Sequence, residues 1–252
     1  MSALGAPTRD DLTCGRMAQL AQMDASDAGI TSLVGIENLT GLTLLDVSQN
    51  PIGQLDRLAS LTGLTTLLAR ATGVSSIGWV QGLTGLFYLD LAENSITNVG
   101  ALAGLRDLFV LDLRSNSIGD VSAVGGLDLL RFLYLADNAL TDVAPLGGLA
   151  NLTTLLLDDN AIADIGSLNA MASLRTLSLG ANSIDDLTAL AGLTSLTFVE
   201  LRENFSLSDV QPLLDNVGLG DGDVVGLRDT AVACPDVTAL RDKGVTVDSG
   251  CP

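Results

Sequence analysis

The sequence predicts a solenoid of the α/β class, in which short units stack and contribute their strands to one parallel sheet. Two observations lead to this prediction. A leucine recurs every 22 residues without a slip, from Leu20 to Leu196. Within a unit, apolar residues first alternate, as Leu111 and Leu113 do, and then recur at every third position from Ile118 onward. A fixed period of this length indicates units that bury their apolar faces only against one another.

The two halves of a unit predict different local structures. Alternation of apolar and polar residues indicates a short strand with one buried face. A strict spacing of three suits 3₁₀ turns or an extended return, because side chains eclipse every third residue there, whereas an α-helix needs spacings of three and four. We therefore expect each unit to hold a strand, a turn and a tight return segment.

The unit has the form LxxLxLxxNxIxxIxxLxx, which resembles the leucine-rich repeat. Its length of 22 residues resembles the internalin and Sds22-like class of that repeat. The resemblance implies a right-handed, curved solenoid with the sheet on its concave face and 3₁₀ or extended turns on its convex face. It also implies binding of a protein partner, as an analogy drawn from the fold.

The chain is expected to divide into three segments. Residues 1–21 form a leader and an N-terminal cap helix, which covers the open end of the stack with Leu12, Met17 and Leu20. Residues 22–219 hold the repeats, with an insertion after Asn204 that displaces the apolar pattern to Leu207. Residues 220–252 hold the last strand and a C-terminal cap.

The end of the chain resembles the C-terminal caps of secreted bacterial leucine-rich repeat proteins. A short helix through Val237 and Leu240 leads to a last strand, and Cys234 and Cys251 flank this cap, which suggests a disulfide between them. Cys14 lies at the other end of the stack, far beyond the roughly 7 Å that separates bridged Cα atoms. The alternative is two reduced thiols that pack in the cap. A disulfide indicates an extracellular or cell-surface location, with the cytoplasm as the alternative.

One polar residue, nearly always asparagine, recurs shortly after each strand. A side-chain amide both donates and accepts hydrogen bonds, so it can satisfy backbone groups where the chain leaves the sheet. The spacing places these residues inside the stack and predicts a structural ladder, not a ligand site. Its members are Asn50, Thr72, Asn94, Asn116, Asn138, Asn160, Asn182 and Asn204.

Composition excludes several classes of function. The formal net charge is −18, which disfavours nucleic acid and anionic membranes as partners. Histidine is absent, and the sequence has no phosphate loop or nucleophile motif, so we expect no catalysis. Asp221 and Asp223 resemble the start of a calcium loop, but Val224 and Val225 supply no further oxygen ligands. We expect no metal, no cofactor and no membrane insertion.

Outward-facing positions of the strands form columns across the predicted concave face. Tyr88, Phe132, Tyr134 and Phe198 fall on these columns, although the chain has only one tryptophan, two tyrosines and five phenylalanines. Folding does not require aromatic residues on a solvated face, so they predict an interface core. Arginines on a neighbouring column would bind carboxylates of a partner. The predicted partner-binding residues are Leu68, Tyr88, Val110, Phe132, Tyr134, Leu156, Phe198, Arg70, Arg114 and Arg202.

Three alternatives remain open at this point. Strands favour aromatic residues in any case, and the arginines have Asp112 and Glu200 as neighbours with which they can pair. The chain could also be a structural spacer of a larger secreted protein. Binding of a glycan or a regular surface is a third reading, based on threonines in phase from Thr40 to Thr84 that lapse at Arg106. We expect a monomeric, non-catalytic module that binds an unidentified protein partner.

Overall fold

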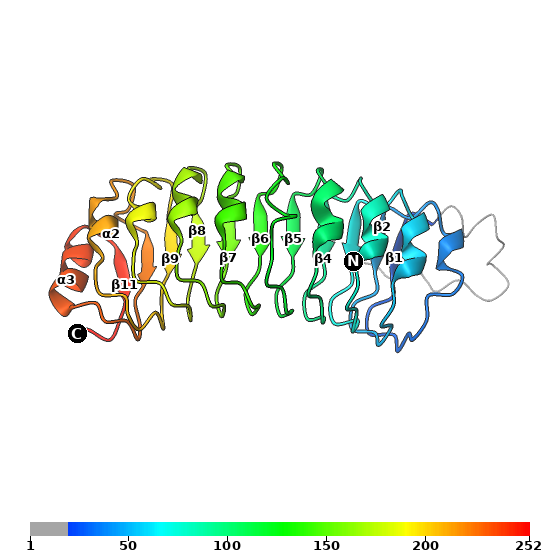
Figure 1. Cartoon of the computed structure of the whole chain (residues 1–252), viewed down its shortest axis with the longest axis horizontal. Coiled ribbons are helices and arrows are strands. Elements are labelled where there is room, and N and C mark those ends of the chain that lie inside the picture. Colours follow the sequence, from blue (N-terminus) through cyan, green and yellow to red (C-terminus); the bar gives the residue numbers. More distant parts are fainter. Residues whose placement is uncertain (1–19) are drawn as a thin grey trace.

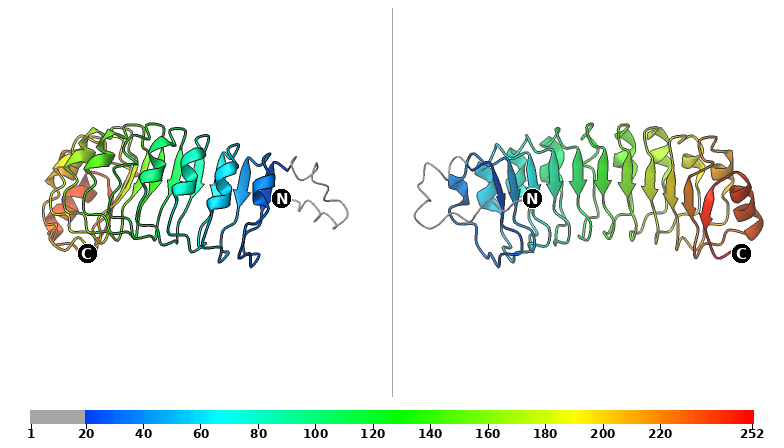
Figure 2. Two further views of the ribbon diagram at one scale, coloured as in Figure 1. Left: turned by 45° about the vertical axis from the view of Figure 1, so that its right-hand side comes forward. Right: turned by 180° about the vertical axis from the view of Figure 1, so that it is seen from behind.

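The computed structural model describes residues 20–252, which form one eleven-stranded parallel sheet with its strands in sequence order. The units stack along the long axis, and the first and last strands lie at opposite ends (Figure 1). The strands line one face of the stack and the short helices cover the opposite face (Figure 2). This confirms the predicted α/β solenoid. The expected cap helix through Leu12 and Met17, and Cys14 with it, lie outside the described residues.

All the strands are three residues long, and most return segments contain a 3₁₀ helix. The strands are β1 (Gln22–Asp24), β2 (Leu44–Asp46), β3 (Thr66–Leu68), β4 (Tyr88–Asp90), β5 (Val110–Asp112), β6 (Phe132–Tyr134), β7 (Thr154–Leu156), β8 (Thr176–Ser178), β9 (Phe198–Glu200), β10 (Val224–Gly226) and β11 (Thr246–Asp248). The 3₁₀ helices are η1 (Ile36–Asn38), η2 (Asp56–Ser60), η3 (Gly78–Gly82), η4 (Gly100–Gly104), η5 (Ala144–Gly148), η6 (Gly166–Ala170) and η7 (Thr188–Leu190). The α-helices are α2 (Gln211–Asp215) and α3 (Cys234–Asp242).

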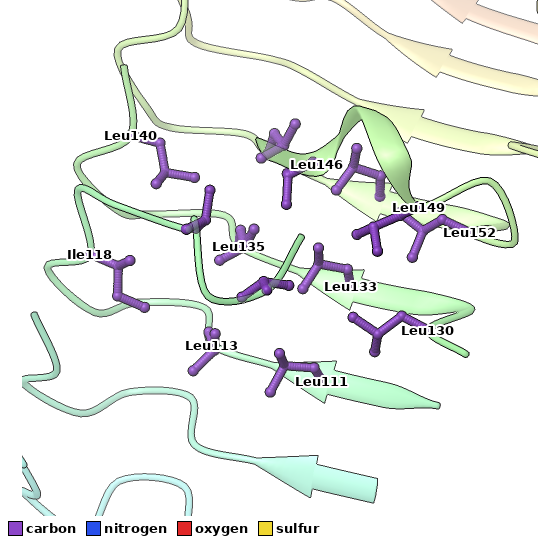
Figure 3. Close-up of a cluster of buried hydrophobic side chains, with 14 of the residues drawn as sticks. Leu111, Leu113, Ile118, Leu130, Leu133, Leu135, Leu140, Leu146, Leu149 and Leu152 are labelled. Carbon is purple, nitrogen blue, oxygen red and sulfur yellow. The ribbon is translucent and has the colours of Figure 1, made fainter. Parts of the chain in front are cut away.

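The register of the sheet follows directly from the repeat length. Equivalent residues of neighbouring units pair, so Leu89, Leu111 and Leu133 lie side by side in β4, β5 and β6. All three are fully buried, and Figure 3 shows Leu111 and Leu133 pointing into the stack, toward apolar residues of the return segments such as Ile118 and Leu140. The buried side chains form one continuous cluster from Leu33 to Val247, so no unit has a core of its own.

The asparagines connect each unit to the unit before it. The Asn116 amide nitrogen lies 3.0 and 3.1 Å from the carbonyl oxygens of Leu113 and Arg114 in its own unit. It also lies 3.1 Å from the carbonyl oxygen of Leu91 in the preceding unit, and its Oδ1 accepts the N–H of Ile96 at 2.9 Å. The side chain therefore satisfies backbone groups on both sides of the joint between two units.

Thr72 leaves one rung of this ladder incomplete. Its hydroxyl donates to the carbonyl oxygen of Ala69 at 3.2 Å, which lies in the same unit. No side-chain oxygen at position 72 accepts the N–H of Ile52, which donates instead to the carbonyl oxygen of Asn50 at 2.8 Å. The threonine side chain thus satisfies its own corner but does not reach the preceding unit, to which Thr72 is hydrogen-bonded through its carbonyl oxygen, the acceptor of the Gly53 N–H at 2.9 Å.

The insertion after Asn204 changes one return segment from a 3₁₀ helix to an α-helix. Phe198 of β9 pairs with Val224 of β10, so this unit is 26 residues long and not 22. Leu207 and Leu213 are fully buried, in the displaced pattern that the sequence predicts. The expectation of a tight 3₁₀ return is wrong for this unit, because the additional residues allow the helix α2 to form.

Lys243, the only lysine of the chain, holds the C-terminal cap against α2. Its Nζ donates to the carbonyl oxygens of Leu213 at 3.0 Å and Leu214 at 2.8 Å, and also to that of Asn216. These carbonyl groups lie at the C-terminal end of α2, where they have no partner within the helix and where the helix dipole favours a cation. Lys243, at the C-terminal end of α3, therefore caps α2.

The cap itself consists of α3, β11 and one disulfide. Val237 and Leu240 of α3 are buried against the last units. The last strand begins at Thr246, and Val247 is its buried residue. Cys234 and Cys251 form a disulfide with a Cα–Cα distance of 5.5 Å. The disulfide connects the start of α3 to the end of the chain.

Replacing Asn116 with alanine should lower the free energy of unfolding by about 1 to 3 kcal/mol, because backbone groups inside the stack lose their partner. Urea melts measure this loss. Asn169 is exposed on η6, so Asn169→Ala serves as a control that should change stability little. Equal losses in both variants, or no loss in Asn116→Ala, would contradict a structural role for the ladder.

Cys234 and Cys251 should resist alkylation in native protein without reductant, because both sulfur atoms are in the disulfide. Reduction should lower the free energy of unfolding by about 3 kcal/mol, as expected for a loop of this size. Peptide mapping identifies the bridged peptides, and melts with and without reductant measure the stability. Two freely alkylated thiols in unreduced protein would show that the bridge does not form.

Candidate functional site

The predicted columns of outward residues exist in the sheet. In the first column Tyr88 of β4 pairs with Val110 of β5, which pairs with Phe132 of β6. In the second column Asp90 pairs with Asp112, which pairs with Tyr134. The side chains of the first column and Tyr134 are half-buried, so neighbouring side chains cover part of each of them. The three central strands thus place aromatic and acidic groups side by side.

The structure brings some of the predicted partner-binding residues together and separates others. Leu68 on β3 and Leu156 on β7 border the aromatic group on its two sides. Phe198 lies on β9, three strands beyond Phe132, which is roughly 14 Å at the usual strand spacing. The threonines of β7 and β8 occupy the same column between them. We therefore define the central cluster as Tyr88, Val110, Phe132 and Tyr134.

Arg114 pairs with an acid of its own strand. Its Nε lies 3.0 and 3.1 Å from the two carboxylate oxygens of Asp112, and a terminal nitrogen lies 2.5 Å from Oδ2. Its guanidinium also lies over the ring of Tyr134, 5.3 Å from the ring centre, in the geometry of a cation–π contact. The contacts raise the pKa of Arg114, mainly through the hydrogen bond to Asp112. Arg114 therefore supports the central cluster.

The other two arginines are more loosely held. Arg70 pairs with Glu93 at 2.5 Å, and this contact raises the pKa of Arg70 and lowers that of Glu93. The Nε of Arg202 lies 3.6 Å from Oε1 of Glu203, and a terminal nitrogen of Arg202 lies 4.0 Å from Oδ2 of Asp159. Arg202 forms no ion pair with Glu200. These side chains are substantially exposed, and exposed ion pairs are weak. These ion pairs therefore hold Arg70 and Arg202 only weakly.

Asp90 is a buried acid of this face that forms no ion pair with the described residues. The residue is only 8% exposed, and its Oδ1 accepts the N–H of Ala92 at 2.9 Å. Within residues 20–252 it has no ion pair, because Arg114 pairs with Asp112 and Arg70 pairs with Glu93. Burial is the main cause that raises the pKa of Asp90, and repulsion from Asp112 adds to it. A carboxylate in this position is held at a cost to stability.

Two aromatic residues beside the sheet were missed by sequence reasoning. Phe87 and Phe109 immediately precede β4 and β5, so they lie outside the columns that alternate with the buried leucines. Their rings are stacked, with centres 4.8 Å apart and an angle of 11° between the planes. Phe109 also lies 5.7 Å from Phe132, so the central cluster extends beyond the sheet. The signal was present, because both residues share one position in the 22-residue repeat.

Two further features, a metal-ligand cluster and a helix that could span a membrane, are absent from residues 20–252. Within residues 20–252 no three His, Cys, Asp or Glu side chains are grouped in a way that could hold a metal ion. Asp223, considered above for calcium, accepts the N–H of Gly220 at 2.8 Å in a turn. No helix of this part of the chain has the length and apolar character needed to cross a membrane.

Comparisons with known proteins agree with the repeat pattern. Family models described as "Leucine rich repeat" and "Leucine Rich repeats (2 copies)" match residues 69–118 and 128–170. The solved structure of internalin C2 from Listeria monocytogenes is 36% identical, with 75% of this chain and 84% of that chain covered and a TM-score of 0.74. The chain belongs to the internalin-like leucine-rich repeat family.

The structural similarity to internalins extends over nearly the whole of this chain. The structure of an internalin InlF from the same organism has a TM-score of 0.91 at 27% identity, and it covers 98% of this chain and 72% of that chain. The functional domain of InlJ from Listeria monocytogenes, at 24% identity, has a TM-score of 0.72, with 94% of this chain and 54% of that chain covered, and shows the fold alone. A sequence search of curated proteins gives no match.

In this internalin-like protein, replacing Asp90 with asparagine should raise the free energy of unfolding at neutral pH. The folded-state pKa of Asp90 is raised, so the folded protein binds this proton more tightly than the unfolded chain, and stability falls as pH rises through that pKa. Asparagine removes the buried charge and keeps an oxygen for the N–H of Ala92.

Urea melts of wild type and Asp90→Asn at neutral and acidic pH measure the effect. The gain in stability should shrink as the pH falls below the folded-state pKa of Asp90, because the wild-type carboxylate is then protonated as well. Asp112→Asn is the matched control and should lose stability, since Arg114 loses a charged partner. A loss of stability in Asp90→Asn at neutral pH would show that the charge serves the fold.

Proposed function

We propose that this chain is a non-catalytic recognition module that binds a protein partner on its concave face, centred on Tyr88, Phe132 and Tyr134. The observation that supports the proposal most strongly is the position of these side chains. They project from the sheet and not into the core, so the leucine core is complete without them. Large aromatic side chains lose few rotamers on binding and dominate the energy of many interfaces.

The net charge of the chain favours a basic partner. The chain has a net charge of −18, so a partner with complementary charge associates faster and discriminates against acidic competitors. Arg70 and Arg202, whose ion pairs are exposed, would then hold acidic groups of the partner at the rim, while Arg114 stays paired with Asp112. Such an interface weakens as salt is added, because exposed charges are screened.

We propose an extracellular or cell-surface location for the module. The disulfide between Cys234 and Cys251 supports this proposal, because structural disulfides persist in oxidising compartments. The rigid stack, with its continuous core, also suits a binding surface that changes little when the partner binds.

Affinity capture with the full chain as bait tests the proposal when three baits are compared. The double variant Phe132→Ser/Tyr134→Ser should keep a nearly unchanged melting temperature, because neither side chain is part of the buried core. It should bind a partner of the wild type at least tenfold more weakly. Phe205→Ser is the control, because Phe205 is 71% exposed and lies after β9, away from the central cluster.

Three results would count against the proposal. Unfolding of the double variant would show that Phe132 and Tyr134 belong to the core. Equal capture by wild type and the double variant would place the interface elsewhere on the molecule. If no protein binds the wild-type bait selectively, the chain is better explained as a structural spacer.

A further inference from the structure

A shallow groove lies beside the sheet, at the N-terminal ends of its central strands. Its apolar part consists of the stacked rings of Phe87 and Phe109 together with Leu129. Phe87 is 49% exposed and Leu129 is 52% exposed. Both side chains therefore present apolar surface that a bound partner would bury. Asp107, Arg131 and Asn151 form the polar rim, and the groove has a volume of ≈ 410 Å³. Exposed apolar groups with a polar rim are typical of contact sites.

Other units of the repeat show which residue the fold accepts at the position of these phenylalanines. At the equivalent position of other units, threonine donates its hydroxyl to a carbonyl oxygen of the preceding unit. The bonds run from Thr43 to Ala21 at 3.0 Å, from Thr65 to Thr43 at 3.1 Å, from Thr153 to Arg131 at 3.0 Å and from Thr197 to Arg175 at 3.3 Å. The fold therefore accepts a polar, self-satisfying residue at this position. Phe87 and Phe109 depart from it in two units of the central cluster, and two later units carry arginine at this position, at Arg131 and Arg175.

The groove is continuous with the concave face. Phe109 contacts Phe132 of the central cluster at a ring-centre distance of 5.7 Å. Asp90 lies three residues after Phe87, which corresponds to about 10 Å along an extended chain. An apolar site and an acidic site thus lie within the reach of a few residues of one bound segment.

The acidic site is suited to a cation that the chain does not supply. Asp90 uses Oδ1 for the N–H of Ala92, and its Oδ2 accepts no hydrogen bond from residues 20–252. The nearest arginines are held by other acids, since Arg114 pairs with Asp112 and Arg70 with Glu93. An added cation would form a charge-assisted hydrogen bond in a poorly solvated place, where such a bond is strongest.

We propose that the groove and Asp90 together bind one protein segment that carries a large apolar side chain and, a few residues away, a lysine or arginine. The apolar side chain lies on Phe87, Phe109 and Leu129, and the basic group binds Asp90 beside Tyr88. This proposal rests on the proposed function and specifies its partner. Charge complementarity selects a basic segment, because the chain carries −18 and the site an unpaired carboxylate.

Panning of a phage-displayed library of random dodecapeptides against the full-length chain tests this proposal. Enriched peptides should combine phenylalanine, leucine or tryptophan with lysine or arginine. Phe109→Thr introduces the residue that other units carry at this position. It should lower the affinity of these peptides at least tenfold. Asp90→Asn should lower the affinity of these peptides several-fold and reduce the salt dependence of binding. Phe205→Ser, which removes an exposed phenylalanine elsewhere, should leave their binding unchanged.

The outcomes separate this proposal from the proposed function. If the peptides bind Phe109→Thr and Asp90→Asn as they bind wild type, but do not bind Phe132→Ser/Tyr134→Ser, the proposed groove site is contradicted. Recognition by the concave face would then still stand. Peptides that bind all variants equally count against both. Enrichment of sequences without a basic residue, or no enrichment, also overturns the proposal. Melting curves of both single variants confirm that weaker binding does not reflect unfolding.

Discussion

The fold depends on how each unit turns its chain out of the sheet without leaving backbone polar groups unsatisfied. At this corner one residue of every unit adopts a left-handed conformation, with φ between 47° and 58° from Asp27 to Asp229. The asparagine that follows closely then bonds carbonyl groups of two units, as Asn116 does with Leu91 and Leu113. A non-glycine residue at positive φ costs roughly 1 to 2 kcal/mol, so the hydrogen bonds and the packing of the stack must offset this strain.

The same constraint keeps the repeat length constant and gives the outer surface its regularity. Because the ladder bonds require equivalent residues to face one another, a unit cannot slip by one residue without losing both its core and its corner. The insertion after Asn204 follows an unbroken series of 22-residue units. In the unit that contains the insertion, the buried Asn216 donates to the carbonyl oxygens of Leu190 and Leu193. Each strand is thus held at a fixed place, and the exposed positions remain free to vary. Recognition can be built on the concave face without disturbing the core.

The sequence was sufficient to predict the solenoid, the sheet register and the ladder, because all three follow from residue type and a fixed period. The sequence offered pairing of the arginines with Asp112 and Glu200 as an alternative, and of these only the Asp112 pair forms. It did not predict that Asp90 would stay without an ion pair among the described residues, since each arginine has several acids within reach and side-chain rotamers decide among them. Phe87 and Phe109 were overlooked because they precede the strands. The residues at the left-handed corner, such as Ala71 and Ala181, are too varied in type to reveal their conformation.

Photo-crosslinking from two positions of one unit tests the central claim, that the concave face around β4 to β6 binds a protein. A photoreactive phenylalanine analogue at Val110 lies within the central cluster, and the same analogue at Ser122 lies in the return segment of that unit, which leads from β5 to β6. We expect a crosslinked protein from position 110 and none from position 122. Crosslinks from position 122 alone would contradict the claim.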